Sequence, residues 1–283
     1  MNSNHLQKAI ETRKSTRTFQ KEPLSPVELE KISGYLNKPE NLIGPFGYQF
    51  EFELLIESEE RDKDQIGTYG FIKNPQGYIL GSSILETKSL FDYAYVLENI
   101  VLYLTAIGVG TCWLGGRFQK QEAMSQLSVK ENEIIPAITP IGYPQEKQRL
   151  KERMIRSVLQ ARKRKPEEQL FYYEAFGQPL GDRAEEFRQA LHYVRIGPSA
   201  QNKQPWRLVF GNNLTQVHFY VTNPLADNPL YMCEPQYLDI GIAYNHFQTG
   251  LDEVGISGEL NIHEPDIDVP DGFFYITSWY RDW

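Results

Sequence analysis

The feature that most constrains this chain is a long pattern that occurs twice. An apolar helical pattern runs from Asp92 to Gly108, and a similar one runs from Asp239 to Gly255. The aspartates and the glycines are both displaced by 147 positions (239 − 92 and 255 − 108). Apolar residues at helical spacing predict a buried helix in each copy, and each glycine suits the left-handed cap that ends a helix. The shared displacement favours duplication over chance.

Strand-like runs accompany both copies of this pattern. Residues 134–141 and 272–279 follow the two helices, and residues 49–56 and 206–210 also read as strands. We therefore predict an α+β fold of two tandem lobes, residues 1–165 and 166–283, each with helices around an antiparallel-dominated sheet. The charged stretch 145–165 is predicted to connect the lobes, partly as a solvated helix over residues 150–164.

Composition narrows the functional classes. A chain of 283 residues that is 41% hydrophobic can bury one large core or two moderate ones. A net charge of −8 argues against nucleic acid, because phosphate binding needs a basic surface. The sequence has no long apolar run and no apolar stretch near its start, so we expect a cytoplasmic protein without a membrane partner. The two cysteines, Cys112 and Cys233, are expected to be buried and to form neither a metal site nor a disulfide.

The first motif that suggests chemistry is Arg13-Lys14-Ser15-Thr16-Arg17. Two guanidinium groups can give forked, charge-assisted hydrogen bonds to a phosphate monoester, and Ser15 can add a hydroxyl donor. The alternative is a basic turn after an amphipathic first helix. A helix start follows at Ser25-Pro26, where serine suits the N-cap and proline the first helical position.

The second motif is Pro198-Ser199-Ala200-Gln201-Asn202-Lys203-Gln204-Pro205-Trp206. The amide of Asn202 offers both an acceptor and a donor, which suits the polar edge of a heterocyclic ring. Pro198 and Ser199 are expected to form a turn that brings backbone close to that ring. The alternative is a plain loop that enters the strand at Trp206.

Together the two motifs resemble the flavin mononucleotide (FMN) site of the nitroreductase family. Members of that family are homodimers, and each FMN takes one motif from each subunit. Here the motifs lie 185 positions apart (198 − 13), and each half lacks the motif that the other half keeps. Residues 42–53 stand in place of the second motif in the first half, and residues 171–177 stand roughly in place of the first motif in the second half. The resemblance therefore implies an intrachain pseudo-dimer that binds one FMN as a monomer, with further association left open.

The resemblance also implies further cofactor-binding residues. The backbone of Leu114, Gly115 and Gly116 would pass along the flavin and donate an N–H group to N5, and Lys73 would lie near the pyrimidine edge. Each of these segments could instead be a plain loop or helix exit. Arg162 and Arg164 would bind the phosphate, although they could equally be solvated linker charges. The complete implied set is Arg13, Lys14, Ser15, Arg17, Lys73, Leu114, Gly115, Gly116, Arg162, Arg164, Pro198, Ser199, Ala200 and Asn202.

The implied function is that of a flavoprotein oxidoreductase using NADH or NADPH. Hydride would pass through flavin N5 to a nitroaromatic, a quinone or a similar flat acceptor, without a catalytic side chain and without a metal. The sequence has no GxGxxG motif after a strand, but the family needs no separate nucleotide-binding domain. Two alternatives remain: a flavin-binding sensor or carrier with little turnover, and a specialised flavin enzyme such as a flavin-cannibalising or dehalogenating relative.

Overall fold

The computed structural model describes residues 3–57, 66–145, 163–223, 225 and 228–282. They form two compact units. The N unit comprises Thr12–Gln160 and Asn228–Cys233, and the C unit comprises Met1–Glu11, Ala161–Asp227 and Glu234–Trp283. The first helix thus belongs to the C unit, and six residues from the second half of the chain belong to the N unit. The predicted helix over residues 150–164 lies almost entirely outside the described residues.

The N unit contains a four-stranded antiparallel sheet with the order β1-β2-β6-β4. Its strands are β1 (Phe52–Ile56), β2 (Gly77–Gly81), β4 (Gly110–Thr111) and β6 (Ile138–Gly142). A second, two-stranded sheet pairs β3 (Ser83–Ile84) with β5 (Glu133–Ile134). The helices are α2 (Pro26–Leu36), α3 (Thr87–Ala106) and α4 (Lys120–Gln126), with a short 3-10 turn η1 (Pro39–Asn41).

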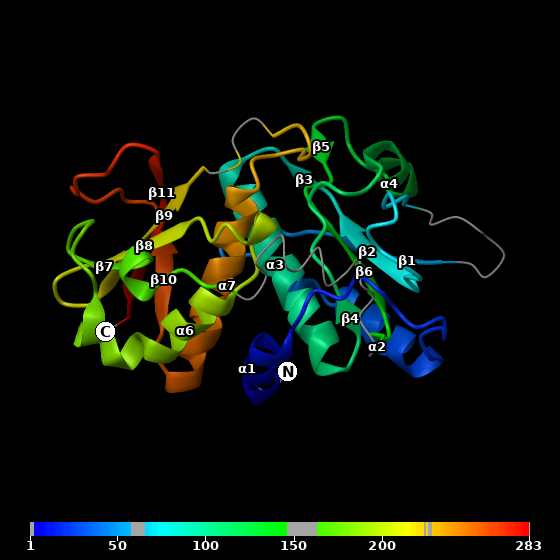
Figure 1. The fold of residues 1–283 in the computed structure, drawn as a ribbon, viewed down its shortest axis with the longest axis horizontal. Coiled ribbons are helices and arrows are strands. Elements are labelled where there is room, and N and C mark those ends of the chain that lie inside the picture. Colours follow the sequence, from blue (N-terminus) through cyan, green and yellow to red (C-terminus); the bar gives the residue numbers. More distant parts are fainter. Residues whose placement is uncertain (1–2, 58–65, 146–162, 224, 226–227, 283) are drawn as a thin grey trace. The chain divides into compact units, whose positions relative to one another are not determined.

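Helix α3 is the core element of the N unit (Figure 1). It is buried over most of its length because apolar residues occupy several of its faces. The hydroxyl of Tyr93 donates to the carbonyl groups of Gly81, at 3.1 Å, and Ala137, at 2.6 Å. The helix ends at Ala106, and Gly108 then adopts a φ of +84° that a side chain would disfavour.

The C unit contains a five-stranded sheet with the order β10-β11-β9-β8-β7. Its strands are β7 (Phe171–Tyr173), β8 (Trp206–Phe210), β9 (Gln216–Thr222), β10 (Gly258–Asn261) and β11 (Phe273–Arg281). Among these described strands the β7–β8 pair is parallel, and the other neighbouring pairs are antiparallel. The helical segments are α1 (Ser3–Thr12), α6 (Arg188–Ile196), α7 (Gln236–Val254), η2 (Glu167–Gln169), η3 (Gly181–Phe187) and η4 (Ala200–Asn202).

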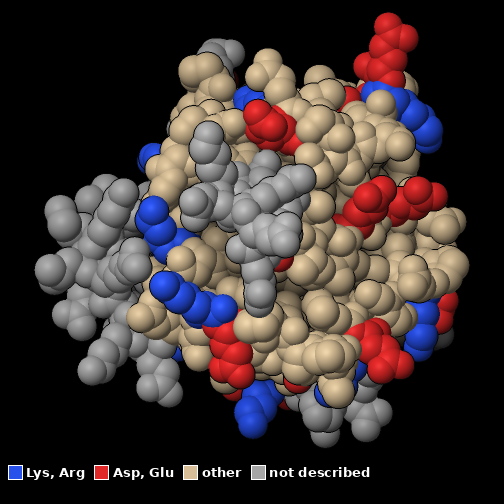
Figure 2. Space-filling view, turned by 90° about the vertical axis from the view of Figure 1, so that its right-hand side faces the viewer, with Lys and Arg blue, Asp and Glu red and all other residues tan. Residues whose placement is uncertain are grey.

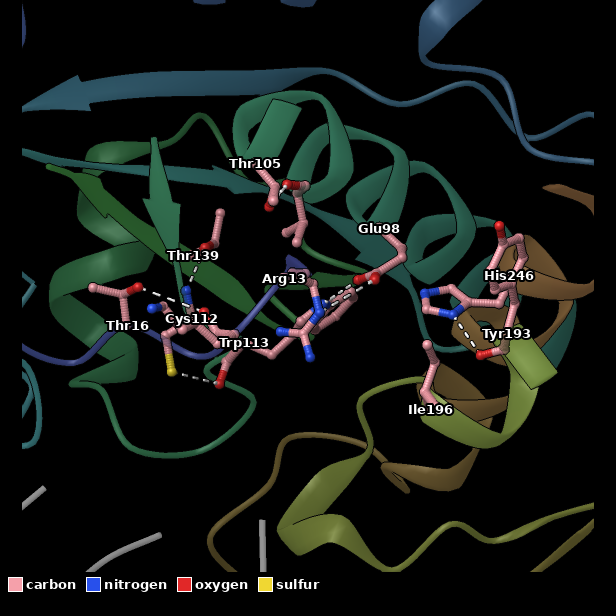
Figure 3. A network of polar contacts seen from close by, with 12 residues as sticks. Arg13, Thr16, Glu98, Thr105, Cys112, Trp113, Thr139, Tyr193, Ile196 and His246 are labelled. Carbon is pink, nitrogen blue, oxygen red and sulfur yellow. Dashed lines mark hydrogen bonds and ion pairs between the residues drawn. The ribbon is translucent and has the colours of Figure 1, made fainter. Parts of the chain in front are cut away.

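Helices α6 and α7 pack side by side in the C unit (Figure 1). Their close approach depends on Gly250, where an added Cβ would lie 2.3 Å from Cα of Ala190. The ring nitrogen Nδ1 of His246 also lies 2.9 Å from the carbonyl oxygen of Tyr193, which ties α7 to α6 (Figure 3). Helix α7 ends at Gly255 in the left-handed conformation, with φ of +71°.

The structure confirms both predicted long helices and the predicted α+β class. Some boundaries differ. The run 134–141 is divided between β5 and β6, which belong to different sheets. The side chain of Ser25 caps α2 as predicted, by accepting from the N–H of Glu28. Cys112 is buried, whereas Cys233 is only partly buried, contrary to the prediction for that residue.

Candidate functional site

The arginine motif lies in the N unit as an extended segment held by backbone hydrogen bonds. The N–H of Thr16 donates to the carbonyl of Thr111 in β4 at 2.7 Å. The N–H of Lys73 donates to the carbonyl of Arg17 at 2.9 Å, and the N–H of Phe19 donates back to the carbonyl of Lys73 at 2.9 Å.

The guanidinium of Arg13 points at a buried carboxylate on α3 (Figure 3). Its Nε atom lies 4.0 Å from Oε1 of Glu98, and the two side chains are 8% and 0% exposed. The other carboxylate oxygen of Glu98 accepts a hydrogen bond from Nε1 of Trp113 at 2.6 Å. Atom Nη1 of Arg13 is buried and has no hydrogen-bond partner among the described residues. Glu98 therefore orients Arg13 without using all of its donors.

Arg17 has still fewer partners for its donors. The residue is 7% exposed, and its Nε and Nη1 atoms are buried without a hydrogen-bond partner in the described part of the chain. Its guanidinium carbon lies 5.2 Å from the ring centroid of Phe71, and that of Arg117 lies at the same distance. A buried guanidinium with unused N–H groups costs free energy unless an acceptor completes it. Arg13 and Arg17 are thus suited to hold an anion such as a phosphate monoester.

The glycine segment of the N unit is packed differently from the prediction. Both backbone groups of Leu114 pair with Ile138, so its N–H is used within the protein. An added Cβ at Gly116 would lie 2.4 Å from the carbonyl oxygen of Leu230, and one at Gly115 would lie 3.3 Å from the ring of Tyr231. Glycine at 116 is therefore required by the segment 228–233, apart from any role toward a flavin.

The second motif forms a tightly bonded loop in the C unit. Gln201, Asn202 and Gln204 have φ values of +50°, +57° and +48°, in the region that non-glycine residues rarely adopt. The hydroxyl of Ser199 accepts from the N–H of Gln204 at 2.9 Å. The side chain of Gln204, which is 3% exposed, accepts from the N–H of Lys165 at 2.8 Å. These bonds join the loop to the segment that follows the connector.

The structure brings Asn202 and Arg164 together. Nη1 of Arg164 donates to Oδ1 of Asn202 at 3.1 Å, and its Nη2 donates to the carbonyl of Ile196 at 3.0 Å. The amide nitrogen of Asn202 donates to the carbonyl of Lys163 at 2.9 Å. The Asn202 amide thus helps to shape its own loop, a role that the sequence analysis did not anticipate.

A buried aspartate on α7 holds the same loop. The carboxylate of Asp239 accepts from the N–H of Ala200 at 2.8 Å, and the residue is 4% exposed. Burial raises the pKa of Asp239 to about 8, although the hydrogen bond from Ala200 acts in the opposite direction. Its counterpart in the N unit, Asp92, accepts from the N–H groups of Phe46 and Tyr48. Burial raises the pKa of Asp92 to about 6, again against the effect of its hydrogen bonds.

The predicted site residues therefore divide between the two units. In the N unit, Lys14 and Lys73 are exposed, in contrast to the mostly buried arginines. Arg162 lies outside the described residues. Sequence reasoning assigned no site role to four residues that shape the half-sites, namely Glu98, Trp113, Gln204 and Asp239. Glu98 had a usable signal, because it is the one acidic residue within the apolar stretch 93–104.

None of the described helices is long and apolar enough to span a membrane. Within the described ranges no cluster of three or more His, Cys, Asp or Glu side chains could hold a metal ion. Figure 2 shows lysine, arginine and acidic side chains interspersed over one face of the molecule.

Comparison with known proteins identifies a family. Residues 5–251 match the family model described as "Putative TM nitroreductase". A "putative nitroreductase" of Thermotoga maritima is 19% identical with a TM-score of 0.61, over 97% of this chain and 93% of that one. Nitroreductases with bound FMN from Bacteroides fragilis and Desulfitobacterium hafniense are each 17% identical, over 52% of this chain and 92% of theirs, with TM-scores of 0.39 and 0.41. A search of curated protein sequences found no match. The family match and the Thermotoga structure confirm the predicted resemblance and the nitroreductase-like fold.

Proposed function

Because the chain belongs to this nitroreductase family, a family of oxidoreductases, we propose that it is an FMN-dependent NAD(P)H oxidoreductase. The observation that carries the proposal is the pair of buried guanidinium groups of Arg13 and Arg17, because Nη1 of Arg13 and both Nε and Nη1 of Arg17 lack partners among the described residues. A phosphate monoester supplies both the charge and the acceptor oxygens that these donors need. The described residues thus fit the phosphate of FMN.

Each half-site has a distinct task in this proposal. Arg13, Ser15 and Arg17 bind the phosphate, and Glu98 keeps the Arg13 side chain oriented toward it. Exposed Lys73, whose backbone is paired with that of Arg17, is available to the pyrimidine edge of the ring. When bound, FMN supplies hydride transfer between NAD(P)H and a flat acceptor such as a nitroaromatic or a quinone.

The loop of residues 198–202 would bind the ring system of the same FMN. Its strained conformation, fixed by Gln204 and Asp239, presents Pro198, Ser199 and Ala200 without further ordering. Binding to a loop that is already ordered loses less conformational entropy than binding to a mobile one. We propose one FMN per chain, held by a pseudo-dimer of the two lobes, so that a monomer suffices.

A titration of the purified chain with FMN tests the cofactor assignment. Flavin absorbance against protein concentration should give one FMN per chain, and sedimentation should detect a yellow monomer, whereas flavin bound only by a dimer would contradict the proposal that a monomer suffices. A ratio near two would contradict the pseudo-dimer, and a ratio near zero after reconstitution would contradict the flavin assignment.

An anaerobic experiment tests turnover. NADPH added to the FMN-loaded protein should bleach the flavin absorbance, and a quinone or nitroaromatic added next should restore it. Both steps together support the reductase. Absence of bleaching with both NADPH and NADH would instead support a flavin-binding protein with little turnover, and bleaching without recovery would point to a specialised acceptor.

A further inference from the structure

We infer that Asp239 is a positioning residue that holds the loop 198–204 in its flavin-binding conformation. The inference rests on the proposed function, because it concerns the same site. Asp239 would not contact the flavin. It would act through the backbone of Ala200, and the conformation of that loop would set the affinity for the ring system.

Asp239 lies in the first turn of α7, is 4% exposed and accepts the N–H of Ala200 at 2.8 Å. Ala200 opens the turn η4, directly before Gln201 and Asn202 with their positive φ values. Backbone in that region is unfavourable for non-glycine residues and persists only where its surroundings hold it. The bond from α7 fixes the entrance of the strained segment to the core of the C unit.

Other bonds of the loop connect it to segments outside α7. Ser199 and Gln204 are bonded to each other, and Gln204 and Asn202 are bonded to residues 163–165. Those contacts join one loop to another. The Asp239 bond, in contrast, joins the backbone of Ala200 to the buried helix α7. Its loss would remove this anchor between the loop and the core of the C unit.

The N unit contains a matched control. Asp92 is the counterpart of Asp239 in the repeat, and it accepts the N–H groups of Phe46, at 3.0 Å, and Tyr48, at 3.1 Å. The loop that it holds lacks the PSxxNxQPW pattern. Substituting Asp92 therefore removes the same kind of buried contact from a loop to which we assign no flavin contact.

The experiment measures the FMN dissociation constant and the free energy of unfolding of the full chain with four variants. Asp239→Ala should weaken FMN binding roughly tenfold, the effect of one lost hydrogen bond to a buried carboxyl group. Asp239→Asn should bind FMN within about threefold of wild type, because its amide oxygen can still accept the Ala200 N–H. Asp92→Ala should lose comparable stability and keep wild-type FMN affinity.

The fourth variant removes the donor instead of the acceptor, in case Asp239→Ala fails to fold. Ala200→Pro has no N–H, and the preceding Ser199 already has φ of −149° and ψ of 160°, which suit a residue before proline. Ala200→Pro should weaken FMN binding about as much as Asp239→Ala does. The double variant should bind FMN little worse than either single variant, because both substitutions remove the same hydrogen bond between Ala200 and Asp239.

Two outcomes would overturn the inference. One is wild-type FMN affinity in both Asp239→Ala and Ala200→Pro. The other is an equal loss of affinity in Asp92→Ala and Asp239→Ala, which would indicate a general effect of stability. Failure of the wild-type protein to bind FMN would instead contradict the proposed function and is recognised before any variant is compared.

Discussion

Helices α3 and α7 carry an equivalent buried aspartate but use it on different loops. Asp92 accepts two N–H groups from the loop that contains Phe46 and Tyr48, and Asp239 accepts one from Ala200. Both loops open with Ile-Gly-Pro, at residues 43–45 and 196–198, and both lead into a strand of the main sheet. The duplicated scaffold and its loop anchors are thus kept, whereas the residues that the two loops present differ.

The edges of the two sheets diverge in a second way. In the N unit the arginine motif lies beside β4, which is an edge strand. The equivalent edge in the C unit is β10, since both strands follow the glycine that ends the long helix. Residues 171–173 instead form β7 at the opposite edge, parallel to β8. The expectation that residues 171–177 stand in place of the arginine motif is therefore wrong, because this segment extends the sheet on its other side.

The packing of the long helices differs as well. Position 250 of α7 is glycine, and the backbone of α6 comes close to it at Ala190. The equivalent position of α3 is Tyr103, whose ring stacks on that of Tyr35 in α2 with centroids 4.2 Å apart. In the C unit, α6 thus packs against the backbone of α7 at Gly250. In the N unit, α2 packs against α3 through the stacked rings of Tyr35 and Tyr103.

The largest expected effect separates the two half-sites by ligand. Arg13→Ala should weaken FMN binding by roughly 10- to 150-fold, because a lost charge-assisted bond costs on the order of 1.5–3 kcal/mol. Riboflavin has no phosphate, so its affinity should barely change. Fluorescence titration with both ligands measures the contrast. Equal losses for the two ligands in a folded protein would show that the arginine segment is no phosphate site.

Controls for this contrast come from both units. Lys130→Ala removes an exposed cation of the N unit that pairs with Glu133, and it should leave both affinities unchanged. Asn202→Ala should weaken FMN and riboflavin alike. Part of that loss would come from the loop itself, since the Asn202 amide bonds to Lys163 and Arg164.

The next effect separates the two aspartates by pH. The pKa of Asp239 is raised to about 8 and that of Asp92 to about 6, from ordinary values near 3.8. A carboxyl group whose pKa is raised on folding makes its full contribution to stability below about pH 4, near its pKa in the unfolded chain. That contribution is lost as the pH rises through the pKa of the folded state. Between pH 6 and 8, Asp239 is the one of these two residues that should still lower the free energy of unfolding as the pH rises, by at most about 1.4 kcal/mol per pH unit.

Chemical denaturation from pH 6 to 8 measures this difference. Asp239→Asn cannot titrate, so its free energy of unfolding should fall less steeply than that of the wild type. Asp92→Asn should keep the wild-type slope in this range. Parallel curves for the wild type and Asp239→Asn would mean that Asp239 is ionised throughout.

A smaller effect tests the helix packing of the C unit. Gly250→Ala should destabilise the protein by roughly 1–3 kcal/mol, because the new methyl group would meet the backbone of Ala190 and the helices must separate. Gly34→Ala is the matched control, since α2 has open space at that position. Thermal unfolding of both variants suffices, and a stabilised Gly250→Ala would contradict the described contact.

How far the sequence could predict this structure depends on the range of each interaction. The long helices, the glycines that end them, the strand at Trp206 and the cap at Ser25 follow from periodicity and local backbone preference. The assignment of the first helix to the C unit and of residues 228–233 to the N unit does not, because it depends on contacts between distant segments. The hydrogen bond between Arg164 and Asn202 could not be predicted for the same reason, since the two residues are 38 positions apart. Gly116 shows the same limit, because a side chain at this position would collide with the carbonyl oxygen of Leu230, a residue distant in sequence.

The smallest effect concerns the aromatic pair of the N unit. Tyr103→Leu should lower the free energy of unfolding by about 1 kcal/mol, because it removes the stacked ring contact with Tyr35 and the hydrogen bond from the Tyr103 hydroxyl to the carbonyl of Lys31. Tyr103→Phe keeps the ring and loses only the exposed hydrogen bond, so its cost should be less than half as large. If the two substitutions cost the same, the hydroxyl and not the stacked pair holds α2 at this position. In that case the two units would differ less in how they pack their helices than the ring geometry indicates.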